Sequence, residues 1–351
     1  EKFTWVVQDM SWLYDHKAQF SLGSLYVSTR LKESGVNDVD LYDTNEQDIY
    51  DIPYADVFAF STMYNTYPDT VRLARILKKI HPTSKVIMGG VHPTQVGPKW
   101  GNAEDEIVEN LFDAIFMGEA EDSICDFVKD YNNNEIKTVY DRTTPDIDKI
   151  FPDRSMPPED YIRTGSIFAG GKTYAEGGST AVILSRGCPF LCAFCSSPNF
   201  WGRKVRYRTM DSIRKEFEQI IDEWGIRQFR IQDDTFTLNY KFVKDLCAVL
   251  KPLDIFWRCS TRVDTLAKHN DFSEMMYDAG CREVGVGIEV ADNDALKKLV
   301  KQQTTDVMYK AVTQMTDAGI RSRQYYLIGT PYDSYKTMES NIDFIEKTGA
   351  V

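Results

Sequence analysis

Three cysteines fall within eight residues of the chain, in the stretch Cys188-Pro-Phe-Leu-Cys192-Ala-Phe-Cys195. The apolar run 181–185 comes just before them and predicts a buried strand, which Arg186 and Gly187 end. Three thiolates on a loop at the C-terminal end of a strand suit an iron–sulfur cluster, because cysteine thiolates are its usual ligands. A four-iron cluster normally takes four of them. Three cysteines would therefore leave one iron open for another ligand.

Zinc and plain core packing are the alternative interpretations of these cysteines. A structural zinc ion needs four ligands, which usually come in pairs along the chain. After Cys195 the next cysteine is Cys247 and the next histidine is His269. The spacing therefore favours the cluster over both alternatives.

The composition restricts the class of protein. The 351 residues allow two domains with proper cores, and 42% apolar with 27% charged residues is ordinary for a globular protein. A net charge of -12 argues against a general nucleic-acid binder, and no apolar run has the length of a membrane span. Seven cysteines, three of them clustered, predict a metal site in a reducing compartment, hence a cytoplasmic protein. The chain starts without Met and stops at Val351 where another strand is expected, which suggests C-terminal truncation.

Residues 1–140 alternate strand and helix patterns, which predicts a doubly wound parallel sheet. Ligands of such sheets bind at the C-terminal ends of the strands. The residues at the predicted strand ends include glycines, which would let a bulky ligand approach the backbone. These candidate site residues are Ser61, Thr62, Met63, Gly89, Gly90, His92, Gly118 and Glu119.

Residues 141–178 contain many prolines and glycines and are predicted to be a linker. Strand and helix patterns resume over residues 179–351. The predicted strands are 181–185, 228–232, 255–259, 283–288 and 324–328. This succession indicates a partial (βα)6 barrel with its active site at the C-terminal rim of the strands.

The cysteine spacing, with the aromatic Phe194 before the last cysteine, resembles that of the radical S-adenosylmethionine (SAM) enzymes. The N-terminal part resembles the cobalamin-binding domain of their class B members. Ser61-x-Met63 and Gly89-Gly90 match its Ser and Gly-Gly elements, and residues 118–121 match its Gly-Glu-x-Glu. One element is different: the Asp-x-His-x-x-Gly that supplies a histidine to cobalt is absent, since Asp15 and His16 are adjacent. Cobalamin would then have no histidine below the cobalt, and a domain that has lost the cofactor is the alternative.

The resemblance extends to the barrel rim. It implies that Asp234 lies below the SAM amino group, that Glu289 of Gly-Ile-Glu contacts SAM, and that Lys301 lies near the SAM carboxylate. Gly329 belongs to a turn that packs on adenine in the family, although Tyr332-Asp333 replaces the usual Gly-Glu here. Arg262 and Asp264 match Thr-Arg-x-Asp and are expected to be structural. Arg208 is expected to brace the cluster loop through Glu216.

The resemblance implies a [4Fe-4S] cluster held by Cys188, Cys192 and Cys195, and SAM cleavage to a 5′-deoxyadenosyl radical. The favoured function is a cobalamin-dependent methyltransferase acting on an unactivated carbon. The alternative is a cyclase or ring-rearranging enzyme with the same cofactors. Methylthio transfer to RNA is rejected, because a second cluster needs three N-terminal cysteines and residues 1–140 contain only Cys125. The expected partners are a small-molecule or natural-product substrate and an electron donor such as flavodoxin or ferredoxin.

Overall fold

The computed structural model describes residues 1–8, 21–96 and 111–349. Asp15 and His16 lie outside this part of the chain. The structure divides into two compact units, one made of Glu1–Ile162 with Asn199–Trp201 and the other of Arg163–Pro198 with Gly202–Val351. In the described residues, no helix is long and apolar enough to cross a membrane.

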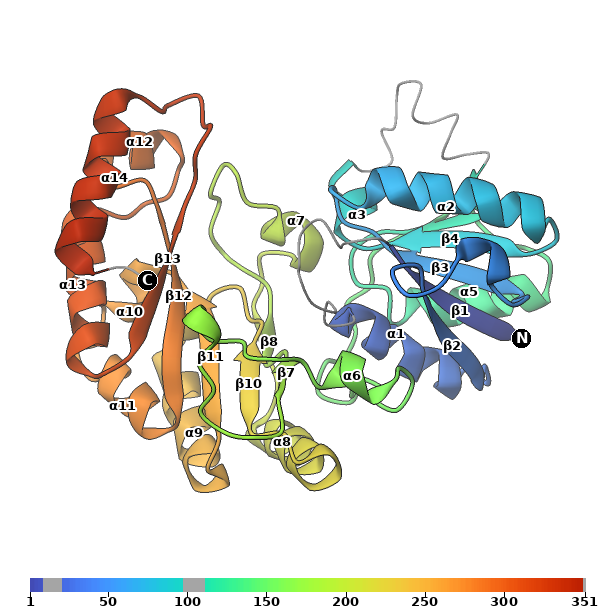
Figure 1. Ribbon diagram of the computed structural model, residues 1–351, viewed down its shortest axis with the longest axis horizontal. Helices are drawn as coiled ribbons and strands as arrows, with labels where there is room; N and C mark the ends of the chain where they lie inside the picture. Colours follow the sequence, from blue (N-terminus) through green and yellow to red (C-terminus); the bar gives the residue numbers. More distant parts are fainter. Residues whose placement is uncertain (9–20, 97–110, 350–351) are drawn as a thin grey trace. The chain divides into compact units, whose positions relative to one another are not determined.

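The first unit is built on a six-stranded parallel sheet of order β2-β1-β3-β4-β5-β6. This confirms the predicted doubly wound sheet. Figure 1 shows α2 and α3 on one face of the sheet and α1 and α5 on the other. The elements are β1 (Lys2–Val7), α1 (Leu22–Glu33), β2 (Asp38–Asp43), β3 (Val57–Ser61), α2 (Tyr67–Ile80), β4 (Lys85–Gly89), α3 (Val91–Val96), β5 (Ala114–Phe116), α5 (Ser123–Asn132), β6 (Val139–Tyr140) and α6 (Glu159–Ile162).

Alternating apolar residues of the strands fill both faces of this sheet. Phe58 and Phe60 of β3 pack in one cluster with Leu73 and Leu77 of α2. On the other face, the ring of Phe116 in β5 packs edge to face on that of Phe127 in α5, with the ring centroids 5.7 Å apart. Burial on both faces is what parallel sheets require. The strand ends are thereby held at one edge, where the candidate residues of this unit lie.

The second unit contains a five-stranded parallel sheet of order β13-β12-β11-β10-β7. The sequential order is that of a partial barrel, as predicted. The strands are β7 (Ser179–Val182), β8 (Ser185–Arg186), β9 (Arg206–Tyr207), β10 (Gln228–Ile231), β11 (Phe256–Thr261), β12 (Cys281–Glu289) and β13 (Arg321–Tyr326). The helices are α7 (Ser197–Trp201), α8 (Met210–Trp224), α9 (Tyr240–Leu250), α10 (Val263–Leu266), α11 (Phe272–Asp278), α12 (Asn293–Lys298), α13 (Thr305–Asp317) and α14 (Tyr335–Thr348).

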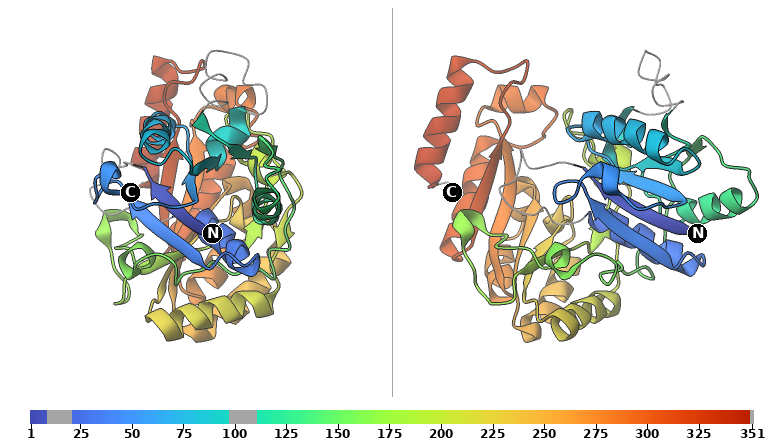
Figure 2. Two further views of the ribbon diagram at one scale, coloured as in Figure 1. Left: turned by 90° about the vertical axis from the view of Figure 1, so that its right-hand side faces the viewer. Right: turned by 45° about the vertical axis from the view of Figure 1, so that its right-hand side comes forward.

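Helices α8, α9, α11 and α13 run along the outer side of this sheet (Figures 1 and 2). Phe217 of α8 packs on Phe229 of β10, with ring centroids 4.6 Å apart. Side chains alternate across a strand, so the neighbours of Phe229 face the inner side of the barrel. Two strands differ most from their predicted ranges. β13 spans Arg321–Tyr326 instead of 324–328, and β7 ends at Val182, after which Ser185–Arg186 forms a separate antiparallel pair with β9. The backbone turns there because it must leave the sheet to begin the cysteine loop.

Candidate active site: the cysteine loop and the barrel rim

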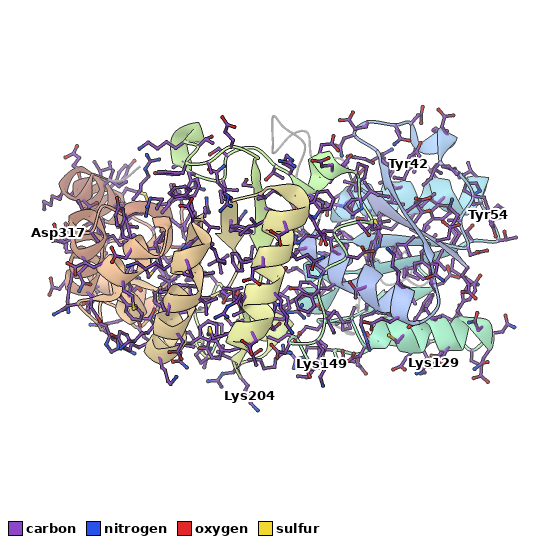
Figure 3. All side chains as sticks on the ribbon, turned by 90° about the horizontal axis from the view of Figure 1, so that it is seen from below. Tyr42, Tyr54, Lys129, Lys149, Lys204 and Asp317 are labelled. Atoms are coloured by element: carbon purple, nitrogen blue, oxygen red, sulfur yellow. The ribbon has the colours of Figure 1, made fainter. Side chains whose placement is uncertain are left out.

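The cysteine loop begins at a glycine that no other residue could replace without strain. Gly187 has a φ of 111°, and a Cβ there would lie 2.5 Å from the carbonyl oxygen of Lys204. The Lys204 side chain points away from the protein (Figure 3), so only its backbone faces the loop. Further along, backbone N–H groups of the loop donate to carbonyls outside it, Cys188 to Gly202 at 3.2 Å and Ala193 to Leu299 at 3.0 Å. The loop is therefore fixed at both ends.

The three thiols lie close enough to affect one another. Burial raises the pKa of the Cys195 thiol, and the neighbouring Cys188 and Cys192 thiols raise the same pKa further. Cys188 is buried, Cys192 half-buried and Cys195 exposed. In the described part of the chain, no three His, Cys, Asp or Glu side chains converge as they would around one metal ion. A four-iron cluster binds each thiolate through a different iron, so its ligands need not converge on one point.

Two buried charged side chains, Asp233 and Arg208, hold the backbone that leads into the loop. Asp233, directly after β10, accepts hydrogen bonds from the Leu184 backbone N–H at 2.8 Å and from the Ser185 hydroxyl at 2.5 Å. Burial raises the pKa of Asp233 to about 6. Arg208 forms a buried ion pair with Glu216 and donates to the Ile183 carbonyl at 3.2 Å. This confirms the predicted bracing by Arg208 through Glu216.

Asp234 holds the far end of the loop. It accepts a hydrogen bond from the Ser197 hydroxyl at 2.6 Å, two residues after the last cysteine of the motif. Burial raises the pKa of the Asp234 carboxyl. Its expected role toward the SAM amino group stays a prediction. The contact with Ser197 was not predicted, because nothing in the local sequence pairs the two residues.

Glu289 and Lys301 form a buried ion pair at the C-terminal end of β12, with Nζ 2.7 Å from Oε1. Only 6% of the Lys301 side chain and 9% of the Glu289 side chain are exposed. Glu289 has a positive φ of 63°, and Val300 and Gln302 near Lys301 also have positive φ values, of 54° and 55°. Non-glycine residues rarely adopt this conformation, and it concentrates at functional sites. The sequence predicted both residues as SAM contacts but did not predict that they pair.

Arg262 connects the cysteine loop to this ion pair. Its Nη1 donates to the Cys192 sulfur at 3.1 Å, its Nη2 donates to the Lys301 carbonyl, and Asp264 binds the other edge of the guanidinium. The guanidinium also lies 3.9 Å from the centre of the Phe190 ring. Phe194, 41% exposed, has the Lys301 ammonium 5.6 Å from its ring centre. The expected structural role of Arg262 and Asp264 therefore includes a direct contact with a cluster thiol.

In the turn after β13, the side chain of Asp333, which stands where the family has Glu, folds back onto the turn's own backbone. Asp333 accepts hydrogen bonds from the backbone N–H of Gly329 at 2.6 Å and of Thr330 at 3.0 Å. A hydrogen bond from the Thr330 hydroxyl lowers the pKa of Asp333, as do these backbone contacts. Gly329 has a φ of 94°, and a Cβ there would meet nothing within 4 Å. The contact of Gly329 with adenine stays a prediction.

In the first unit, the candidate residues gather at the C-terminal ends of β3, β4 and β5. Ser61 pairs with Gly89, and the Thr62 N–H donates to the Gly89 carbonyl at 2.8 Å. A Cβ on Gly90 would lie 2.7 Å from both the backbone N and O of Thr62. Gly118 N–H donates to the Thr94 hydroxyl at 2.7 Å, which itself donates to the Gly90 carbonyl at 2.8 Å. Ser61, the two glycines and Gly118 are thus brought together by hydrogen bonds.

His92 and Glu119 are both buried. The His92 ring stacks on Tyr67 with centroids 4.1 Å apart, at the start of α3. Met63, in contrast, is 41% exposed beside the strand ends, and Tyr64 is 84% exposed. An exposed apolar pair next to glycine backbone suits a flat ligand with apolar edges. Met63 is thus accessible at this edge and His92 is buried in the unit, and the roles of these residues toward cobalamin stay predictions.

Comparisons with known proteins agree with both halves of this description. The model of the radical SAM superfamily matches residues 182–345, and that of the B12 binding domain matches residues 18–128. Together they span well over half of the chain. The chain is 28% identical to an uncharacterized methyltransferase of Pyrococcus horikoshii, over 93% of this chain and 73% of that protein. It is 26% identical to the bacteriochlorophyllide d C-12(1)-methyltransferase of Chlorobaculum tepidum, over 74% of this chain and 54% of that protein.

A third relative is the anaerobic magnesium-protoporphyrin IX monomethyl ester cyclase of Rubrivivax gelatinosus, 24% identical over 90% of this chain and 60% of that protein. The chain thus spans roughly half to three quarters of the length of these relatives. Among solved structures, it shares its fold with the radical SAM methyltransferase TsrM from Kitasatospora setae, with a TM-score of 0.71 at 16% identity over 100% of this chain and 72% of that one. The radical enzyme OxsB gives a TM-score of 0.72 at 17% identity, over 100% of this chain and 52% of that one.

A radical SAM domain implies a [4Fe-4S] cluster and SAM, and a B12-binding domain implies cobalamin. The loop with three neighbouring thiols and the edge of glycines with Met63 fit these groups. The chain belongs to the radical SAM superfamily, among the members that carry a B12-binding domain ahead of the radical SAM domain.

Proposed function

We propose that this chain is the catalytic part of a cobalamin-dependent radical SAM methyltransferase that acts on an unactivated carbon. The observation that carries the proposal is the loop with three neighbouring thiols, which Arg262 joins to the buried Glu289–Lys301 pair. When bound, the cluster supplies the electron that cleaves SAM to methionine and a 5′-deoxyadenosyl radical, and cobalamin supplies the methyl group.

The protein's own residues position these groups. Cys188, Cys192 and Cys195 would hold the cluster and leave one iron open for SAM. Glu289 and Lys301 present a carboxylate and an ammonium in a dry site, where charged hydrogen bonds are strong. Each can bind the group of opposite charge on the amino-acid part of SAM. The left-handed backbone at Glu289 turns its carboxylate toward Lys301 and the rim.

The physiological partners in this proposal are a small-molecule or natural-product substrate and an external one-electron donor such as flavodoxin or ferredoxin. We place the protein in the cytoplasm, because the three thiolates need a reducing environment. The curated relatives include methyltransferases and cyclases, so ring formation with the same cofactors is the second candidate.

The test is anaerobic reconstitution with iron and sulfide, in the presence of hydroxocobalamin. We expect iron and sulfide for one four-iron cluster, an EPR signal of the reduced cluster that SAM changes, and release of 5′-deoxyadenosine. Cys188→Ala should abolish all three. Cys125→Ala, a half-buried thiol of α5 outside the loop, is the matched control and should keep them.

Bound corrinoid after purification would support the cobalamin assignment, and its absence would reject it. SAM labelled with deuterium in its methyl group separates the two candidate reactions. Deuterium appears in the product of a methyltransferase, whereas a cyclase product contains none. An EPR signal that SAM leaves unchanged would contradict both candidates.

A further inference from the structure

Several arginines lie on the inner face of the barrel sheet, where strand register brings them together. Arg230 of β10 pairs with Arg258 of β11, and Arg258 pairs with Glu283 of β12. One step toward the C-terminal ends, Arg323 of β13 pairs with Gly285 of β12. Because Phe229 packs on the outer helix α8, its neighbour Arg230 faces the inner side. We call Arg230, Arg258 and Arg323 the arginine row.

Positive charge exceeds negative charge in this row. Glu283 is the acid that pairs with it, at 3.1 Å from Arg258 and 2.9 Å from Arg323. Burial lowers the pKa of Arg258, and the nearby charges of Arg323 and Arg230 lower it further. Among the described residues, Glu283 thus pairs with two of the three guanidinium groups of the row.

Part of this charge has a structural use. Arg258 and Arg323 both donate to the Ile167 carbonyl of the segment before β7, and Glu283 accepts from the Ala169 N–H at 2.7 Å. These contacts close the segment onto the sheet. They do not involve Arg230, for which the described residues provide neither a hydrogen bond nor an ion pair. Arg258 is 3% exposed, and its Nε is buried without a partner among the described residues.

Part of the same face is exposed. Gly285 lies under the Tyr325 ring, since a Cβ there would lie 2.8 Å from a ring carbon and 3.0 Å from the Ser260 hydroxyl. The Tyr325 hydroxyl lies 3.3 Å from Arg258 Nη2. Arg230 is exposed, Tyr325 is 40% exposed, and 27% of the Arg323 side chain is exposed. Hydrogen-bond donors of the row are therefore accessible on this face, and the Tyr325 ring lies beside them.

We infer that the arginine row binds an oxyanion, a carboxylate or a phosphate, that the substrate carries away from its reacting carbon. This inference rests on the proposed function. Guanidinium groups bind both oxyanions through paired N–H groups. Gly285, which pairs with Arg323, precedes Glu289 by four positions of β12, which is about 13 Å along an extended strand. The row is therefore distinct from the Glu289–Lys301 pair that we assign to SAM.

The test is calorimetric titration of the reconstituted protein with inorganic phosphate and, separately, with succinate. We expect saturable binding of at least one, and the stronger of the two identifies the kind of oxyanion. Arg230→Gln should weaken this binding roughly ten-fold, or about 1.4 kcal/mol, because the variant loses a charged hydrogen-bond donor. Arg214→Gln, an exposed arginine on the outer helix α8, should bind as the wild type does.

Three results would overturn the inference: no saturable binding of either anion, equal affinity in wild type and Arg230→Gln, or displacement of the bound anion by SAM. The titration needs no turnover, so it is independent of the function assay. SAM cleavage without anion binding rejects this inference alone. Anion binding in a protein that cannot cleave SAM rejects the proposed function and leaves the oxyanion site standing.

Discussion

Arg262 Nη1 lies 3.1 Å from the Cys192 sulfur, and Asp264 holds the guanidinium at 2.9 Å and 3.1 Å. The positive charge is thus fixed beside one of the three thiols that we propose as cluster ligands. Hydrogen bonds to cluster sulfurs and local charge both tune reduction potential. Arg262 is a positioning residue whose charge favours the reduced, more negative cluster.

We therefore expect Arg262→Gln to lower the midpoint potential of the reconstituted cluster by tens of millivolts. Arg262→Lys, which keeps the charge, should restore part of the difference. EPR-monitored redox titration measures the potential, and iron analysis verifies that the cluster is complete. Arg214→Gln on α8 is the matched control. An unchanged potential in Arg262→Gln with full iron content would contradict this role.

The Glu289–Lys301 pair predicts strong coupling between two substitutions. Removing one partner leaves the other charge buried and unpaired, which costs about 3–5 kcal/mol of unfolding free energy. Glu289→Gln and Lys301→Met should each show a loss of this order, and the double variant should lose clearly less than their sum. Urea unfolding of the four proteins gives the coupling. Additive losses would show that the two side chains do not interact in solution.

Gly287 leaves the space that the Glu289–Lys301 pair occupies. A Cβ at this position would lie 2.3 Å from the Glu289 carboxylate and 2.7 Å from the Lys301 ammonium. We expect Gly287→Ala to displace the pair, with a loss of about 1–3 kcal/mol as in overpacked cores and with weaker SAM binding. Gly165→Ala, where a Cβ would meet nothing within 4 Å, is the control. Urea unfolding and SAM titration measure both effects, and wild-type values for Gly287→Ala would reject the steric argument.

The cysteine loop and the strand ends could be predicted from the sequence because each is a local signal. Cys188, Cys192 and Cys195 are close along the chain, and the glycines mark the ends of apolar strands. The sequence did not predict the pairing of Lys301 with Glu289 or of Asp234 with Ser197. These contacts depend on how separate loops converge at the rim, which residue spacing does not encode.

Two further cases show the same limit. His92 was a candidate from its place after a strand, and the sequence did not predict that its ring stacks on Tyr67 at the start of α2. Arg230, Arg258 and Arg323 were not singled out at all, since each occupies an ordinary position of its own strand. Only the register of β10, β11, β12 and β13 brings their charges together.

The raised pKa of Asp233 predicts how stability depends on pH. Its pKa is about 6 in the folded protein, against an ordinary value of 3.8, and the cause is burial. Between these two values the folded state binds more protons than the unfolded state, so stability falls as pH rises and levels off above about pH 6. Full linkage is 1.36 kcal/mol per unit, so we expect the wild type to lose about 1–1.5 kcal/mol between pH 5 and pH 7 through this group.

Asp233→Asn cannot titrate and should lack this component. The measurement is the difference in unfolding free energy between Asp233→Asn and the wild type at pH 5, 6 and 7, by urea titration of the protein without cluster. The variant should become more stable relative to the wild type as pH rises, because only the wild type acquires a buried charge. Asp211→Asn, at the exposed start of α8, controls for a general charge effect. A difference that stays constant over this range would show that Asp233 is ionised throughout and that its hydrogen bonds from Leu184 and Ser185 outweigh its burial.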